Sequence, residues 1–179
     1  LSLACARREL DRPLLVSYSD IIYTPDVGAA VVASPGEMAL VVDRRFRDIY
    51  VGRTEHPLDE GEVSDLMPDG TIARVGKRAL PPAEAIGEYI GLTRLSERGV
   101  ATAARTIDRL QEQFAGRDTT PFQRAATYRN AYLTDLWQHL IDGGMRIDPI
   151  LIEGQWREID TGQDLDRARE LVESEQAWS

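Results

Sequence analysis

Short apolar runs alternate with helix-like segments through most of this sequence, and this alternation limits the fold to few classes. Residues 14–19 and 38–42 are continuous apolar runs, which are typical of strands buried on both faces in parallel sheets. Residues 26–33, between them, have the pattern of a short helix that ends at Ser34-Pro35-Gly36. A strand–helix–strand order of this kind predicts helices on both faces of a sheet. We therefore expect a three-layer α/β/α fold of the Rossmann type with a mixed, mainly parallel sheet.

The remaining pattern fits one domain over residues 1–179. Residues 44–80 contain strand-like pieces joined by the hairpin turn Pro68-Asp69-Gly70, so we expect an antiparallel excursion there at the edge of the sheet. The expected strands are 49–51, 63–67, 71–75, 85–95, 147–152 and 156–159, and the expected helices are 1–10, 100–114, 133–141 and 162–174.

Two aspartates stand where predicted strands end. Asp20 follows the run 14–19, and Asp160 follows the run 156–159. Thr161, with Asp164 three residues later, has the spacing of a helix N-cap, which would hold Asp160 in a strand-to-helix turn. Ligands of open α/β sheets bind outside the carboxyl ends of strands, and paired carboxylates suit Mg²⁺. Either aspartate taken alone is more simply a turn residue.

Glu88 is an anomaly in the predicted strand 85–95. Period-two spacing places it in an apolar row with Ile90, and a carboxylate in such a row needs a partner or an opening. Gly87 and Gly91 on the other face would allow another group to approach closely. Glu88 either bonds to neighbouring backbone or faces a ligand, and the sequence leaves both readings open.

Composition narrows the classes of function. The net charge of −9 argues against nucleic acid or an anionic membrane as a partner, but a divalent cation would still allow a nucleotide to bind. Cys5 is the single cysteine, and no apolar run is long enough to span a bilayer, which together favour the cytoplasm. His56 and His139 are isolated, so we find no Ser/His/Asp set.

Several short motifs occur in an order that resembles a known superfamily. They are Ser17-Tyr18-Ser19-Asp20-Ile21, Val41-Val42-Asp43, Ile86-Gly87-Glu88-Tyr89-Ile90-Gly91-Leu92, Leu133-Thr134-Asp135-Leu136 and Trp156-Arg157-Glu158-Ile159-Asp160-Thr161. Together they resemble the MobA-like nucleotidyltransferases, in the branch of the choline-phosphate and phosphonate cytidylyltransferases. This branch includes the domain that is often fused to phosphoenolpyruvate mutase.

The resemblance implies roles for individual residues. Asp20 and Asp160 match the two metal-binding aspartates, with Mg²⁺ as the cofactor. Glu88 and Tyr89 match the segment that lines the acceptor pocket, and Lys77, the single lysine, falls near the acceptor phosphate. Trp156 packs beside Asp160 or forms a wall of the pocket. The reaction implied is attack by an acceptor phosphate or phosphonate on a nucleoside triphosphate, with CTP favoured, and release of pyrophosphate.

One feature of the superfamily is missing. Its members open with a strand and a glycine-rich loop that holds the triphosphate, and nothing of that kind precedes Leu1. We therefore expect an N-terminally truncated form of the domain. Two alternatives stay open: a sugar-1-phosphate nucleotidyltransferase, and an inactive scaffold that binds or regulates a partner. An unpaired sheet edge would make a homodimer plausible in the second case.

Overall fold

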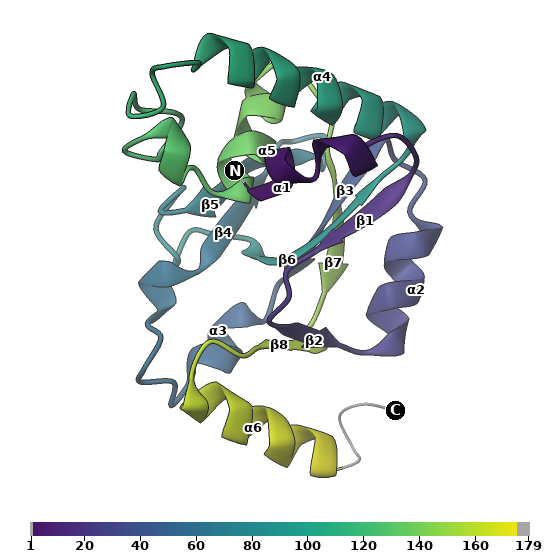
Figure 1. Ribbon diagram of the computed structural model, residues 1–179. Helices are drawn as coiled ribbons and strands as arrows, with labels where there is room; N and C mark the ends of the chain where they lie inside the picture. The colour runs from purple at the N-terminus through teal and green to yellow at the C-terminus, as the bar shows by residue number, and fades with distance from the viewer. Residues whose placement is uncertain (1, 175–179) are drawn as a thin grey trace.

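The computed structural model describes residues 2–174, and Figure 1 shows a central sheet with helices packed around it. The strands of the sheet follow the order β5-β4-β6-β3-β7, and β1 also pairs with β6. Their bounds are β1 Leu14–Ser17, β3 Met38–Asp43, β4 Glu62–Leu66, β5 Ile72–Lys77, β6 Gly87–Leu95 and β7 Asp148–Ile152.

The long strand β6 is the axis of this sheet. One of its edges pairs with β3 over almost its whole length. Its other edge pairs with β4 at Gly87 and Glu88 and with β1 from Leu92 to Leu95. All three pairings are antiparallel, whereas β3 and β7 run parallel.

Helices cover both faces of the sheet. Side chains of α4 (Glu97–Gln113) and α5 (Leu133–Asp142) pack with Met38, Leu40 and Val42 on one face. Side chains of α2 (Pro25–Ala33) and α3 (Phe46–Tyr50) pack with Val41 on the other. α6 (Gly162–Glu173) lies beyond α3 at one end of the molecule (Figure 1). The short elements are α1 Ser2–Cys5, η1 Arg7–Glu9, η2 Leu58–Glu60 and η3 Tyr128–Asn130.

A separate two-stranded ribbon positions the ends of two chain segments. β2 (Ile21–Tyr23) and β8 (Trp156–Glu158) pair antiparallel, with Ile21 opposite Glu158. The sequence pattern predicts β8 but not β2, which is only three residues long. This ribbon places Asp20 next to the segment that carries Asp160.

The three-layer mixed α/β fold is confirmed, but the mainly parallel sheet is wrong. Among the strand pairs of residues 2–174, only β3–β7 is parallel, and the other five pairs are antiparallel. A continuous apolar run reports burial on both faces, and it carries no information on strand direction. β3 illustrates this point, because it is fully buried between one antiparallel and one parallel neighbour.

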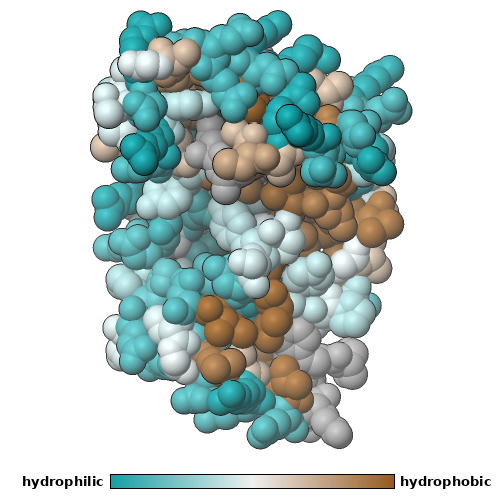
Figure 2. Space-filling model, in the orientation of Figure 1, coloured by the Kyte–Doolittle hydropathy of each residue, from teal (hydrophilic) through white to brown (hydrophobic). Residues whose placement is uncertain are grey.

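Two local predictions are also wrong. Residues 49–51 do not form a strand, because Ile49 and Tyr50 belong to α3. β1 is not buried on both faces: Leu15 is 45% exposed, and β1 pairs with β6 alone among the described strands. Figure 2 shows hydrophobic side chains gathered on the surface along which β1 runs.

Other local predictions are confirmed. The turn at Pro68-Asp69-Gly70 joins β4 to β5, and the closing helix α6 ends at Glu173. The predicted first helix is shorter and irregular, divided between α1 and η1, and its first residue, Leu1, lies outside the described residues. Within residues 2–174, no helix combines the length and apolar character needed to cross a membrane.

Candidate active site

A cavity of about 210 Å³ lies where β6, the β2–β8 ribbon and the β4–β5 hairpin meet. All six residues that the sequence predicts as site residues line this cavity, although they come from four separate segments of the chain. They are Asp20, Lys77, Glu88, Tyr89, Trp156 and Asp160. The structure therefore brings the predicted set together at one place.

The ribbon brings Asp20 and Asp160 to the same wall of the cavity. Ile159 N–H donates to the carbonyl oxygen of Asp20 at 2.8 Å, which continues the β2–β8 ladder by one position. Both aspartates are exposed, so neither carboxylate is buried in the hydrophobic core. Two acidic side chains 140 positions apart in the sequence thus share one opening.

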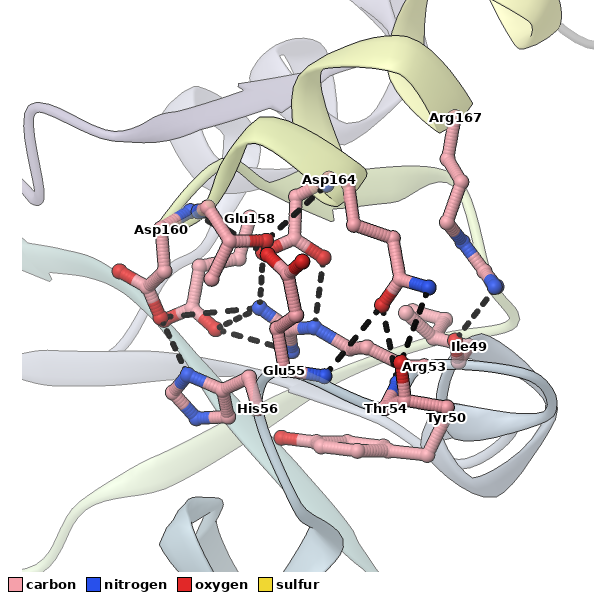
Figure 3. Close-up of polar contacts among 12 residues, drawn as sticks. Ile49, Tyr50, Arg53, Thr54, Glu55, His56, Glu158, Asp160, Asp164 and Arg167 are labelled. Carbon is pink, nitrogen blue, oxygen red and sulfur yellow. Dashed lines mark hydrogen bonds and ion pairs between the residues drawn. The ribbon is translucent and has the colours of Figure 1, made fainter.

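Arg53 holds this wall together from behind (Figure 3). Its guanidinium bonds to both carboxylate oxygens of Asp164, with Nε to Oδ1 at 2.7 Å and Nη2 to Oδ2 at 2.9 Å. Nη2 also lies 3.2 Å from Glu158 Oε2 and 3.6 Å from Asp160 Oδ2. The Arg53 side chain is only 2% exposed, so removing it would leave buried carboxylates without their cation.

Asp164 belongs to the capping box that the sequence predicts. Thr161 Oγ1 accepts from Asp164 N–H, and Asp164 Oδ2 accepts from Thr161 N–H at 3.1 Å. The same carboxylate is paired with Arg53. This one side chain therefore fixes the start of α6, and with it the backbone of Asp160, against the loop that carries Arg53.

His56 is not isolated, contrary to the sequence-based expectation. Its Nδ1 lies 2.7 Å from Asp160 Oδ2. Burial and the charge of Arg53 lower the pKa of His56, against the opposing effect of Asp160. One ligand atom each from His56, Glu158 and Asp160 lie within 4.8 Å of one another.

Glu88 lies at the back of the cavity and is 3% exposed. Tyr50 Oη donates to Glu88 Oε1 at 2.7 Å. No described residue hydrogen-bonds to Oε2. Burial, together with the negative charges of Glu158 and Asp43, raises the pKa of Glu88 to about 8, against the opposing effect of the Tyr50 hydrogen bond.

Gly61 explains how Glu88 fits. A Cβ at Gly61 would lie 2.5 Å from Glu88 Oε1 and 3.1 Å from Tyr50 Oη, so a side chain there would displace the pair. Gly91 serves a different neighbour: its φ is +82°, and its missing side chain leaves room for the Tyr18 ring. The close approach predicted at Gly91 is thus made by the chain's own Tyr18.

A second buried carboxyl, Glu62, also lines the cavity, but both of its oxygens are bonded. Tyr18 Oη donates to Oε2 at 2.7 Å, and Thr134 Oγ1 donates to Oε1 at 2.6 Å. Burial raises the pKa of Glu62, against these two hydrogen bonds. Glu62 therefore cross-links β4, α5 and the segment that follows β1.

Lys77 ends β5 at the rim of the cavity. Its Nζ lies 3.2 Å from Glu60 Oε2 and 5.0 Å from the centre of the Tyr132 ring. Burial alone would lower the pKa of Lys77, but the bond to Glu60 and the nearby acidic groups raise it. Lys77 therefore carries a positive charge at the rim.

Trp156 belongs to the hydrophobic core and also lines the cavity. It is 3% exposed within the hydrophobic cluster on the α2 side of the sheet. Its indole Nε1 donates to Asp43 Oδ2 at 2.9 Å. Tyr89 is buried behind the cavity, where its hydroxyl is paired with Thr93 Oγ1 at 2.7 Å.

The donors in this wall suit a hard divalent cation. Asp20 and Asp160 offer exposed carboxylate oxygens, the ligand type that Mg²⁺ prefers together with waters and substrate phosphates. Arg53 offsets part of the negative charge at Asp160. The residues therefore fit Mg²⁺, and His56 would hold Asp160 in place beside it.

Comparison with curated proteins finds a relative in sequence that is a cytidylyltransferase. No protein-family model matches the chain. CTP:phosphoglutamine cytidylyltransferase of Campylobacter jejuni is 29% identical over 164 residues, which cover 92% of this chain and 61% of that protein. The chain thus spans less than two-thirds of the length of this curated relative.

Solved structures agree at the level of the fold. The inositol-1-phosphate CTP transferase of T. maritima has a TM-score of 0.63 at 17% identity, over 99% of this chain and 62% of that one. The CTP:phosphocholine cytidylyltransferase of Streptococcus pneumoniae has a TM-score of 0.57 at 15% identity, over 96% and 62%. The chain has the nucleotidyltransferase fold. These matches confirm the resemblance to the cytidylyltransferase branch that the sequence motifs indicate.

Sequence reasoning missed three residues that shape this wall, Arg53, His56 and Glu158. Arg53 and His56 lie in a loop after a segment that the pattern assigns to a strand, so no local sequence pattern indicated that they belong to the site. Glu158 offered a signal, because it is an acidic residue in a short β-prone run two positions before Asp160. Burial and the charge of Asp160 raise the pKa of Glu158 to about 7.

Proposed function

We propose that this chain is a nucleotidyltransferase domain that joins the nucleotidyl group of a nucleoside triphosphate, preferably CTP, to a small phosphorylated or phosphonate acceptor. The observation that carries this proposal is the convergence of Asp20 and Asp160 on one cavity that also holds Lys77 and Glu88. Mg²⁺ is the proposed cofactor, held by Asp20 and Asp160. Residues 1–179 would act as a single domain.

The proposed reaction is a substitution at phosphorus. An oxygen of the acceptor phosphate forms a bond to the α-phosphorus, and the bond from that phosphorus to the bridging oxygen of the β-phosphate breaks, releasing pyrophosphate. An ionised acceptor needs no general base, so catalysis rests on positioning and on neutralising charge. Mg²⁺ would supply a positive charge beside the phosphoryl oxygens.

The chain's own residues have distinct parts in this proposal. Lys77 would attract the acceptor phosphate at the rim, and Glu88, with Tyr89 behind it, would form the inner end of the acceptor pocket. Trp156 would form an apolar wall. Arg53 and His56 are positioning residues, because both act on Asp160 and neither is assigned a contact with substrate.

The names of the related proteins support a phosphorylated acceptor. The curated relative is named for phosphoglutamine, and the two structural neighbours for inositol 1-phosphate and phosphocholine. All three are named for CTP, which favours cytidine over other bases. A sugar-1-phosphate acceptor stays the alternative, and an acceptor panel would separate the two.

The remaining predictions concern partners and location. We propose small-molecule substrates rather than nucleic acid or a membrane surface, on the basis of the acidic net charge of −9. A homodimer and a cytoplasmic location for the protein are two further predictions that come from the sequence.

The test is calorimetry of CTP binding with and without Mg²⁺. We expect Mg²⁺-dependent binding by the chain and at least about tenfold weaker binding by Asp20→Asn, because metal sites lose affinity on this scale when a ligand shell is damaged. Asp118→Asn, at an exposed position outside the cavity, is the control and should bind as the unmodified chain does. Equal affinity in all three proteins would refute the assignment of Asp20.

A further inference from the structure

The helix α6 is held against the rest of the domain by polar contacts more than by burial. Of the residues of α6, all of which the structure describes, only Asp164 and Ala168 are buried, while Leu165 is 38% exposed and Val172 is 52% exposed. A surface helix normally gains most of its stability from an apolar face that packs on the core. The position of α6 therefore depends on its hydrogen bonds and ion pairs.

Arg167 joins α6 to the end of α3 (Figure 3). Its Nη2 donates to the carbonyl oxygen of Ile49 at 2.9 Å, and its Nη1 donates to that of Val51 at 3.0 Å. Carbonyl groups at the end of a helix lack partners within the helix, and a cation beside them is favourable. Gly52 follows with a φ of +75°, and a Cβ there would lie 3.4 Å from Arg167 Nη1. Arg167 therefore fixes the backbone turn that leads into residues 53–56.

Gln163 makes a second connection to the same loop. Its Oε1 accepts from the backbone N–H of Thr54 at 2.8 Å, and its Nε2 donates to the carbonyl oxygen of Gly52 at 3.2 Å. Gln163 and Arg167 are four residues apart, so they lie on the same face of α6. Two side chains of one helix face thus bond to the backbone of residues 49–54.

The loop in turn contacts the segment from which α6 starts. Arg53 is paired with Asp164 and lies 3.6 Å from Asp160 Oδ2, and His56 Nδ1 lies 2.7 Å from the same oxygen. The N-cap of α6 is Thr161, directly after Asp160. Asp160 therefore belongs to a closed circuit of contacts, and a displacement of α6 would move both its backbone and its partners.

From these contacts we propose that Gln163 and Arg167 are positioning residues, which hold α6 and residues 51–56 together as one unit. Only the docked unit presents Asp160 to the metal and the nucleotide, so this inference rests on the proposed nucleotidyltransferase function. Because the unit is held mainly by polar contacts, it opens locally while the sheet stays folded. A ligand that binds only the docked form shifts this equilibrium toward docking.

The experiment is amide hydrogen exchange of the full chain, followed by mass spectrometry of peptides from α6, residues 51–56 and β3. It is carried out with and without Mg²⁺ and CTP, and calorimetry of the same samples gives the dissociation constant of CTP. The variants are Arg167→Ala and Gln163→Ala. Arg169→Ala is the matched control, because Arg169 is exposed on α6 and its ion pair is with Asp166 of the same helix.

Without ligand, we expect the amides of α6 and residues 51–56 to exchange faster than those of the fully buried β3. Arg167→Ala should accelerate exchange in both parts of the unit by about tenfold or more, because hydrogen bonds from a charged group are among the stronger ones. Gln163→Ala should accelerate both parts less, because its side chain is neutral, and Arg169→Ala should leave both rates unchanged.

Binding of the nucleotide supplies a readout that a purely structural role would not move. With Mg²⁺ and free CTP at about ten times the dissociation constant, exchange in α6 should slow by about tenfold, because the bound form must release its ligand before the unit opens. The same slowing is expected in Arg169→Ala. If the ligand bound equally well to the undocked form, the local opening of α6 would not respond to it.

Three outcomes would overturn the inference. They are exchange in α6 as slow as in β3, equal rates in Arg167→Ala and Arg169→Ala, and unchanged exchange in α6 when calorimetry shows that CTP is bound. Failure of CTP to bind in the presence of Mg²⁺ would refute the proposed function. The comparison of Arg167→Ala with Arg169→Ala without ligand would still decide whether α6 and residues 51–56 open as one unit.

Discussion

Asp43 and Glu88 face each other across neighbouring strands, yet their surroundings differ. Asp43 ends β3 opposite Glu88 in β6, and both side chains are buried. Asp43 accepts from the backbone N–H groups of Arg45 and Gly154, each at 2.8 Å, and from the indole of Trp156 at 2.9 Å. Within residues 2–174, Glu88 accepts from Tyr50 alone.

The difference separates a structural carboxyl from one that is available to a ligand. Three donors converge on Asp43 and join β3 to the loop after β7 and to β8, so Asp43 fixes backbone near the cavity. Glu88 accepts one hydrogen bond, and its other oxygen has no partner among the described residues. A buried acidic residue at a strand end is therefore not enough to mark a site, and the count of its donors decides between the two roles.

The largest expected effect is on the pH dependence of stability. The pKa of Glu88 is about 8 in the folded chain, against 4.5 for an ordinary glutamate. Between these values the unfolded chain loses this proton and the folded chain keeps it, so the free energy of unfolding falls as the pH rises. Over this range, each pH unit lowers the free energy of unfolding by about 1.4 kcal/mol. The raised pKa of Glu158 acts in the same direction.

Urea unfolding at pH 5 and pH 8 measures this effect. Glu88→Gln has no such proton, so we expect its loss of stability over this range to be smaller than that of the unmodified chain by about 2 to 4 kcal/mol. Equal losses in the two proteins would mean that Glu88 titrates normally and is not held in a dry, uncompensated environment.

A smaller effect is expected from matched amide substitutions at neutral pH. In Asp43→Asn the amide NH₂ must face one of three donors, which should cost about 1 to 3 kcal/mol of stability. In Glu88→Gln the NH₂ can take the free position while Oε1 still accepts from Tyr50, so stability should not fall. Urea unfolding at pH 7 compares the two, and an equal cost at both positions would remove the distinction between them.

Much of the candidate site could be predicted from the sequence, because local patterns indicate several of its residues. Asp20 and Asp160 follow β-prone runs, and Glu88 interrupts an apolar row. Thr161 and Asp164 have the spacing of a capping box, which the structure confirms. Each of these signals needs only a few consecutive residues, so no knowledge of distant contacts was required.

The missed features depend on contacts between distant segments. β2 is three residues long and exists through its pairing with β8, more than 130 positions away. Arg53 and His56 become part of the site only because α6 and the ribbon place Asp164 and Asp160 beside them. The prediction of strand direction was wrong for the same reason. An apolar run indicates that a strand is buried, whereas the chain topology sets whether neighbouring strands run parallel or antiparallel.

The most direct test of the central claim is Mg²⁺-dependent release of pyrophosphate from CTP in the presence of a phosphorylated acceptor. We predict that the unmodified chain releases pyrophosphate only when both Mg²⁺ and the acceptor are present, and that Asp160→Asn reduces the rate by at least about tenfold, because loss of even a supporting group at a metal site has an effect of this size. An unchanged rate in Asp160→Asn, or no release with any phosphorylated acceptor, would contradict the proposed function.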